Sequence, residues 1–124
     1  MKDKINSYED LEVYQRLCKL HLEIHNLSLT FSDFEKFELS SQLRRSSNSA
    51  PANLAEGWNN KHINIYLEGI NRAQGEIQET KHHISIAFKK KYIPEEKFKY
   101  FIEEYNDCGK MLNGLKNSLG KYIT

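Results

Sequence analysis

One short stretch of the sequence has the spacing with which helical proteins bind metal ions. Glu79 and His82 form a Glu-x-x-His unit, but a bundle that holds two irons needs two such units and a glutamate from each of two further helices. The sequence contains one unit. Glu79 also falls nearly opposite the apolar stripe through Ile70, Ile77 and Ile84, so its carboxylate is expected on a solvated face. We therefore predict no metal site and no cofactor.

Two other groups of residues could in principle do chemistry. His21 and His25 are four residues apart and could share a metal ion, but they flank an apolar stripe, where histidines are more often half-buried packing groups. The serines between residues 46 and 49 have no visible histidine and aspartate partners, no nucleophile elbow and no oxyanion-type glycine loop. We predict no catalytic residues and no enzymatic activity.

Positively charged side chains could bind phosphate groups. The 18 Lys and Arg residues are balanced by 17 Asp and Glu, which excludes the strong overall field of a typical nucleic-acid-binding protein. Taken alone, these residues are more simply solvated charges. An oligomeric ring would repeat each local cluster, so modest contacts could add up. Aromatic residues suited to base stacking are not clustered with these charges, so sequence-specific readout is not expected. The predicted nucleic-acid-binding residues are Arg44, Lys61, Arg72, Lys89, Lys90 and Lys91.

The segment QLRRSSNSAPANLAEGW, residues 42–58, has two distinct faces on a helix at about 100° per residue. One face is a core stripe whose centre holds Ser46, Ser47 and Ala50, and small residues there let a neighbouring helix approach closely. The opposite face carries groups that can pair with one another, which favours a hydrogen-bonded contact within or between subunits over a solvated surface. This predicted polar face consists of Gln42, Arg45, Ser49, Asn53 and Glu56.

Two adjacent arginines in this segment receive different predictions. Arg44 falls between the two faces and is expected to reach solvent freely. Arg45 is the better candidate for a structural ion pair. Its partner is expected on another helix, because Glu56 is too far along the same helix. Of the glycines, Gly57 is expected at a helix end and Gly75 at a close packing point.

Four segments with apolar side chains three and four residues apart must position these groups. Ser7 with Asp10, and Ser32 with Glu35, resemble capping boxes and mark the expected starts of the first two helices. Pro94 suits the first turn of the fourth helix. No stretch shows the period-two alternation of strands bounded by hairpin turns. The predicted helices cover about residues 8–29, 33–57, 61–90 and 94–120.

Short joins between these segments favour antiparallel neighbours, so the sequence predicts an all-α, up-down-up-down four-helix bundle in one domain, residues 1–124. Cys18 and Cys108 lie within helical patterns and lack metal-finger spacing, so reduced thiols are expected. No secretory h-region or membrane-length apolar run is present, which favours a cytoplasmic protein without a membrane partner. The regular seam could also join helices of different subunits, so oligomerisation is open.

The block in residues 42–58, with the upstream YEDLEVYQ and the downstream AQGEIQETK, resembles the four-helix bundle family encoded in intervening sequences of bacterial 23S ribosomal RNA genes. The resemblance extends over roughly residues 8–119. In one place the chain departs from the family pattern, because Glu76 stands where the family usually has serine. That departure weakens any role inferred from a hydroxyl there. The residues that match the family block are Gln42, Leu43, Arg44, Arg45, Ser49, Pro51, Asn53, Glu56 and Gly57.

The resemblance implies a left-handed bundle that assembles as a homopentamer and has no established enzymatic activity. It also implies kinship with a fold that serves as the accessory subunit of reverse transcriptases in diversity-generating retroelements and binds nucleic acid with a basic surface. We therefore expect a non-catalytic homo-oligomer that binds RNA or another nucleic acid. The alternative is a scaffold subunit whose partner is an unidentified protein and whose basic residues are incidental. An enzyme or a metal-binding bundle ranks third.

Overall fold

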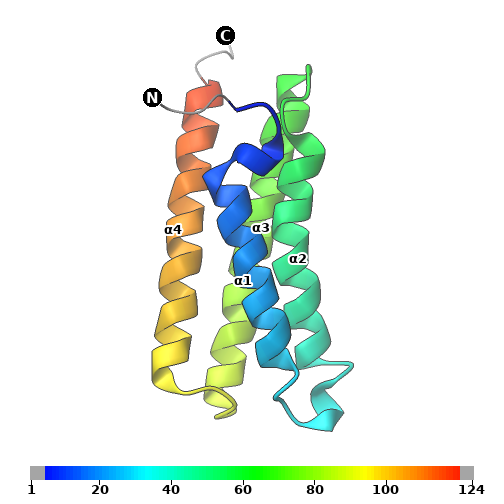
Figure 1. Ribbon diagram of the computed structural model, residues 1–124, viewed down its shortest axis with the longest axis vertical. Coiled ribbons are helices and arrows are strands. Elements are labelled where there is room, and N and C mark those ends of the chain that lie inside the picture. Colours follow the sequence, from blue (N-terminus) through cyan, green and yellow to red (C-terminus); the bar gives the residue numbers. More distant parts are fainter. Residues whose placement is uncertain (1–4, 121–124) are drawn as a thin grey trace.

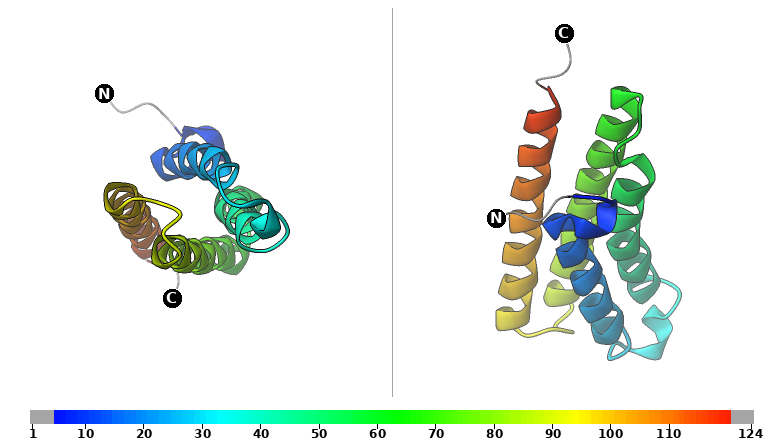
Figure 2. Two further views of the ribbon diagram at one scale, coloured as in Figure 1. Left: turned by 90° about the horizontal axis from the view of Figure 1, so that it is seen from below. Right: turned by 45° about the horizontal axis from the view of Figure 1, so that its top comes forward.

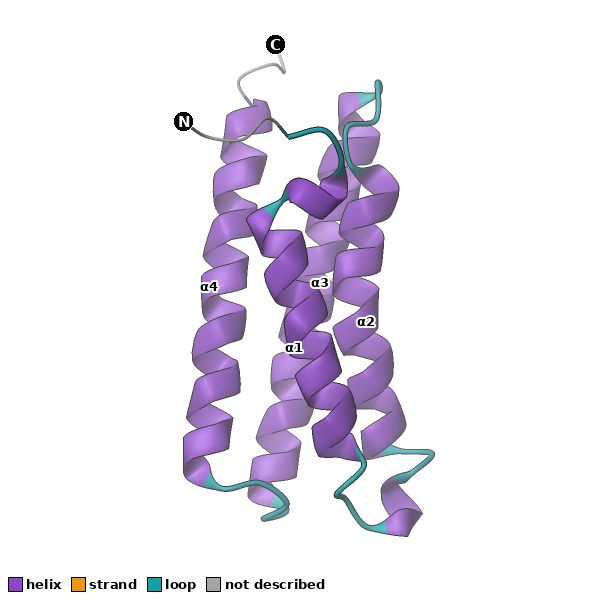
Figure 3. Cartoon of the chain, viewed as in Figure 1, coloured by secondary structure: helices purple, strands orange, loops and turns teal. Residues whose placement is uncertain are grey.

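The structure is a computed structural model that describes residues 5–120. Its four α-helices pack side by side with their axes roughly aligned, and no strand lies within the described residues (Figures 1 and 3), so the predicted all-α fold class is confirmed. No helix in this part of the chain is long and apolar enough to cross a membrane. The α-helices are α1 (Glu12–Ser28), α2 (Leu39–Gly57), α3 (Ile63–Lys89) and α4 (Glu95–Gly120), and two 3₁₀ turns are η1 (Tyr8–Asp10) and η2 (Asp33–Glu35).

Successive helices run in opposite directions. Near the start of α2, Arg45 contacts Glu76 late in α3, whereas Gly57 at the end of α2 approaches Gly69 early in α3. The colours in Figure 1 likewise run down α1, up α2, down α3 and up α4. Seen along the bundle in Figure 2, each helix lies beside two others and α1 is opposite α3. The left-handed sense of the bundle stays a prediction.

The core is formed by the apolar stripes that the helical periodicity predicts. Each helix contributes side chains that are almost completely shielded from solvent, because residues three and four positions apart share one helix face. Tyr105 is the largest of them, and burial raises the pKa of its hydroxyl far above the ordinary value. Core side chains include Leu17, Ile24, Leu43, Leu54, Ile70, Ile84, Cys108 and Leu112.

Small residues line the contact between α2 and α3, which is the most extensive contact between helices in the bundle. Ser46, Ser47 and Ala50 are fully buried, as the core stripe predicts. The hydroxyl oxygen of Thr80 on α3 lies 2.8 Å from Ser46 Oγ and 2.8 Å from the carbonyl oxygen of Glu76, and its single proton is donated to one of them at a time. The polar atoms of this narrow seam are therefore paired across the two helices, as buried polar groups must be.

The closest approach of α2 and α3 is at Gly57 and Gly69. A Cβ atom on Gly69 would lie 2.8 Å from the carbonyl oxygen of Asn53, and one on Gly57 would lie 2.9 Å from that of Ile65. Both distances are too short for carbon against oxygen, so these positions require glycine. A Cβ on Gly75 would meet nothing within 4 Å, so the predicted close packing point at Gly75 is wrong and Gly69 has that role.

The first two helices begin later than predicted. The capping box of Ser7 and Asp10 does form, but it caps η1, because the extended backbone of Leu11 (φ −72°, ψ 126°) separates this turn from α1. Ser32 makes no side-chain cap, and η2 ends at Glu35, four residues before α2 begins. The side chain of Glu35 turns into the protein instead. The fourth helix starts as predicted, directly after Pro94.

Candidate functional site

The predicted polar face of α2 is anchored by Arg45. Its guanidinium lies 3.1 Å from the carboxylate of Glu76 on α3 and also pairs with Glu79, one helical turn further along. Its Nε donates to the side-chain oxygen of Gln42 at 3.4 Å. Arg45 therefore has its partners on another helix of the same chain, as predicted, and Glu76 is one of them. The residue that departs from the family pattern thus stabilises the α2–α3 contact.

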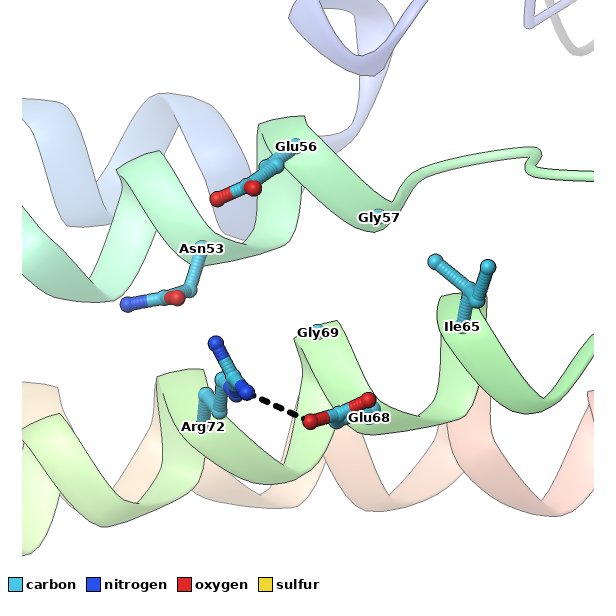
Figure 4. Close-up of a pocket in the computed structure, with 7 residues that line it drawn as sticks. All are labelled: Asn53, Glu56, Gly57, Ile65, Glu68, Gly69 and Arg72. Carbon is cyan, nitrogen blue, oxygen red and sulfur yellow. Dashed lines mark hydrogen bonds and ion pairs between the residues drawn. The ribbon is translucent and has the colours of Figure 1, made fainter.

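The remaining polar-face residues lie further along α2 and do not join the Arg45 network. The side-chain amide of Asn53 donates to the backbone carbonyl of Ser49 at 2.9 Å and to its hydroxyl at 3.0 Å. Glu56 is exposed. Asn53 and Glu56 line a shallow groove of about 220 Å³ above the glycine contact (Figure 4). The other residues of the groove are Gly57, Ile65, Glu68, Gly69 and Arg72.

The Glu79–His82 unit does not form a pair in the structure. Glu79 is half-buried and contacts Arg45 and, at 3.4 Å, His83, so the prediction that it faces solvent is wrong. Burial lowers the pKa of His83, and the positive charges of His82 and Arg45 lower it further. Within residues 5–120, no three His, Cys, Asp or Glu side chains are grouped so that they could hold a metal ion.

The sequence predicts that His21 and His25 are half-buried packing groups. This is confirmed for His21, but His25 is exposed, so the prediction is wrong for His25. The Nδ1 atom of His21 lies 2.7 Å from the hydroxyl of Ser47 and so joins α1 to the core stripe of α2. Burial lowers the pKa of His21, and the neighbouring His25 adds to the effect. The two cysteines are free thiols; Cys108 is buried and Cys18 is partly exposed.

The structure divides the predicted phosphate-binding residues between the two ends of the bundle. Lys61 lies in the turn between α2 and α3, whereas residues 89–91 lie at the opposite end, where α3 turns into α4 (Figure 1). Arg72, on α3, pairs at 2.5 Å with Glu68. Lys61, Lys89 and Lys91 are exposed, and no side chain among residues 5–120 forms an ion pair with them.

Arg44 does not project freely into solvent, so this part of its prediction is wrong. It is half-buried and donates to the hydroxyl of Ser28 at 3.1 Å and to the backbone carbonyl of Lys36 at 3.2 Å. These bonds tie α2 to the end of α1 and to the loop before α2. Arg44 therefore helps to fix the conformation of that loop, and any phosphate contact would compete with these bonds.

The sequence reasoning missed Glu35. This side chain is completely buried, and its Oε2 accepts hydrogen bonds from Lys90 Nζ at 2.6 Å and from the hydroxyl of Tyr92 at 2.8 Å. The bond from Lys90, with that from Tyr92, lowers the pKa of Glu35 despite burial, and the same carboxylate raises the pKa of Lys90. The ring of Tyr92 also packs against Phe31, with centroids 5.1 Å apart.

This buried carboxylate orients the residues on either side of it. Phe34 and Phe37 project outward and are 71% and 84% exposed. Lys36 lies over the ring of Phe37, 5.5 Å from its centroid. One exposed aromatic ring at this end of the bundle therefore contacts a lysine, Lys36, which is not among the predicted nucleic-acid-binding residues. The signal in the sequence is Phe-Glu-Lys-Phe, in which the glutamate does not fit the apolar helical stripe.

The turn after α3 places Lys91 in an unusual backbone conformation. The amide of Tyr92 donates to the carbonyl of Ala87 and that of Lys91 to the carbonyl of Phe88, both at 2.9 Å, which is a Schellman motif. Lys91 occupies its left-handed position with φ 65°, where glycine is the preferred residue. Lys91 therefore adopts a backbone conformation that is unfavourable for lysine.

Comparison with known proteins identifies the family. Residues 9–114 match the family model described as 23S rRNA-intervening sequence protein. The fold is similar to the crystal structure of a protein of unknown function from the S23 ribosomal protein family of Bacteroides thetaiotaomicron VPI-5482. That alignment has a TM-score of 0.77 at 23% identity and covers 85% of this chain and 95% of the other. No curated protein matches the chain in sequence. Because the family model spans most of the chain, the protein belongs to the 23S rRNA-intervening sequence protein family.

Proposed function

We propose that this protein is a non-catalytic, homo-oligomeric module of the cytoplasm that binds RNA. The proposal rests on one observation, namely which basic side chains form ion pairs with carboxylates and which do not. Arg16, Arg45, Arg72 and Lys90 are paired with carboxylates of the chain. Lys61, Lys89 and Lys91, at or next to the turns at the two ends of the bundle, have no such partner among residues 5–120. Cations that are not neutralised by the protein can bind phosphate groups.

Self-assembly would make these few cations effective. One chain has a formal net charge of +1, which is too small for tight binding to a polyanion by a single copy. The family resemblance implies a pentamer, and a ring would present each exposed lysine five times on one particle. Binding of several copies to one RNA would then be favoured by multivalency.

The direct test is binding of a structured RNA hairpin across a salt series, with native mass spectrometry in the same buffers. We expect an oligomer whose RNA affinity falls steeply with salt, because each phosphate contact releases condensed counterions. Absence of binding at low salt would contradict the RNA proposal. A monomeric mass would contradict the assembly proposal.

One observation favours a second function, that of a scaffold subunit for a protein partner. Leu22 and Leu29 are seven residues apart, so they lie on one face of α1 and its C-terminal end, and they are 63% and 67% exposed. Apolar side chains on one helix face are typical of a protein contact surface. Binding through such a surface would depend only weakly on salt, which distinguishes it from RNA binding.

A further inference from the structure

The basal surface of the bundle, defined as Phe34, Lys36, Phe37, Lys89 and Lys91, combines exposed aromatic rings with exposed cations. It lies on η2, the loop that follows it and the turn between α3 and α4, and Figure 1 shows η2 and this turn at the same end of the molecule. Phe34 and Phe37 each expose most of a side chain that can bury about 150–250 Å². Two exposed rings three residues apart in one loop are typical of a surface that is covered by a partner.

The loop holds these rings outward because its carboxylate points inward. The order of residues in the loop, Phe34-Glu35-Lys36-Phe37, would ordinarily place the apolar side chains inside and the charged ones outside. Here Glu35 is buried and bound by Lys90 and Tyr92, while both rings face solvent. Burying a carboxylate is unfavourable unless it is paired, so the Lys90 contact is what permits this reversed arrangement.

The Glu35–Lys90 ion pair also brings the two halves of the surface together. Lys90 lies between Lys89 and Lys91 in the sequence, so its contact with Glu35 joins the segment that carries these exposed lysines to the loop that carries the rings. Lys90 neutralises Glu35, and Arg44 adds a further positive charge below the loop. The loop carries two exposed acidic residues, Asp33 and Glu38, and α4 begins with two more, Glu95 and Glu96, of which Glu95 is paired with Lys99 at 3.4 Å.

Aromatic rings among cations match the chemistry of unpaired nucleotides. Bases in a single strand can stack on aromatic rings, while lysines contact the phosphates between them. In a duplex the bases are already stacked on one another and their faces are not available to Phe34 or Phe37. We propose that the basal surface binds single-stranded RNA by stacking bases on Phe34 and Phe37 and by phosphate contacts from Lys36, Lys89 and Lys91. This inference rests on the proposed RNA-binding function and specifies the strand and the surface.

A substitution at Lys91 can test the role of its charge in RNA binding without destabilising the protein. The left-handed backbone of Lys91 favours glycine, so Lys91→Gly removes a cation from the surface and relieves the backbone at the same position. The variant is expected to unfold at the same temperature as the wild type or higher. Weaker RNA binding by such a variant could not be attributed to partial unfolding.

The test uses the full chain, a fluorescent single-stranded RNA of about twelve nucleotides, within the span that such surfaces cover, and the same sequence annealed to its complement. Fluorescence anisotropy gives the affinity, and native mass spectrometry gives the assembly state. The test variants are Phe34→Ala, Phe37→Ala and Lys91→Gly. Lys110→Gln is the matched control, because it removes an exposed lysine of α4 that lies outside the basal surface and is not among the proposed RNA-binding residues.

We expect the wild type to bind the single strand more tightly than the duplex. Each phenylalanine variant should lose about tenfold or more in affinity for the single strand, since stacking on one aromatic ring contributes about that much. Lys91→Gly should reduce the salt slope by about 0.7 for each phosphate of the single strand that Lys91 neutralises in the wild type. Lys110→Gln should bind the single strand like the wild type.

Three results would overturn the inference. The first is unchanged single-strand affinity in both phenylalanine variants, and the second is equal affinity for single strand and duplex. The third is a lower native mass of the phenylalanine variants with RNA binding retained, which would assign the rings to a contact between copies of the chain. Failure of the wild type to bind any RNA would instead contradict the proposed function itself, and with it this inference.

Discussion

Glu35 and Lys90 are 55 residues apart in the chain, and their side chains meet at 2.6 Å at one end of the bundle. The carboxylate is fully buried, whereas the side chain of Lys90 is 43% exposed, so the contact is an ion pair with one member inside the protein. It joins the loop between α1 and α2 to the turn between α3 and α4. Phe34 and Lys36 are the sequence neighbours of Glu35, and Lys89 and Lys91 are those of Lys90.

Replacing Glu35 with Gln should make the protein less stable at neutral pH and less sensitive to acid. The pKa of Glu35 is lower in the folded protein than in the unfolded chain, where it is about 4.3. The ionised carboxylate therefore makes its full contribution to stability above about pH 4.3. That contribution is lost as the pH falls from there through the lower folded value. The unfolding temperature, measured from pH 7 to pH 3, should therefore fall less for the variant than for the wild type. Parallel curves for the two proteins would contradict this account.

Replacing Gly69 with Ala should destabilise the bundle by about 1–3 kcal/mol, the usual cost of overpacking. The added Cβ would lie 2.8 Å from the carbonyl of Asn53 and 3.2 Å from the Cα of Gly57, and both are backbone atoms that cannot swing aside. Gly75→Ala is the matched control on the same helix. Its Cβ would meet nothing within 4 Å, so it should stabilise α3 by about 0.5–1 kcal/mol.

Urea denaturation of both variants measures this difference directly. Opposite signs for Gly69→Ala and Gly75→Ala would establish that glycine is needed where the helices cross and not for helix formation as such. Equal stabilisation of both variants would mean that α2 and α3 do not approach as closely as described.

Replacing Arg45 with Ala should change the stability of the protein only slightly. It should, however, change the pKa of His83 measurably. The Arg45 side chain is 48% exposed, so its pairs with Glu76 and Glu79 contribute about 1 kcal/mol or less. Its positive charge lowers the pKa of His83, and its removal should raise that pKa. An NMR titration of the His83 ring checks this shift, with Arg72→Ala as the control. An unchanged or lower pKa of His83 would contradict the geometry.

Stability should also fall as the pH drops below about 6.5, because burial disfavours the protonation of two histidines in the folded protein. Burial lowers the pKa of both His21 and His83 below the unfolded value of about 6.5. Below pH 6.5 the unfolded chain therefore takes up protons that the folded chain does not, and the free energy of unfolding decreases. His21→Gln should reduce this dependence in urea titrations at several pH values. A free energy of unfolding that increases on acidification over this range would contradict this prediction.

The helices and the core were predictable because both follow from residue spacing. Stripes such as Leu17 to Ile24 and Ile70 to Ile84 identify the buried face without knowledge of the partner helix. The small residues at Ser46 and Ala50 likewise indicated a close neighbour. The helix starts were less predictable, because Glu35 satisfies the rule for a cap in sequence but is bound by Lys90 and Tyr92.

The candidate site was only partly predictable, because its parts come together through the fold. The exposed lysines near residue 90 could be found in the sequence, but the loop with Phe34 and Phe37, which Glu35 joins to Lys90, is more than fifty positions away. Periodicity also could not distinguish Gly69 from Gly75, because that depends on where α2 crosses α3. The sequence predicted that the partners of Arg45 lie on another helix, but it could not identify them as Glu76 and Glu79.

The most direct test of the proposed function is the RNA affinity of the wild-type oligomer measured across a salt series from about 50 to 300 mM. With four or more phosphates contacted on a single strand, we predict that the logarithm of the association constant falls against the logarithm of salt with a slope of about −3 or steeper. The native mass should stay that of the oligomer throughout. A slope near zero, or no binding at the lowest salt concentration, would contradict the proposal that this bundle is an RNA-binding module.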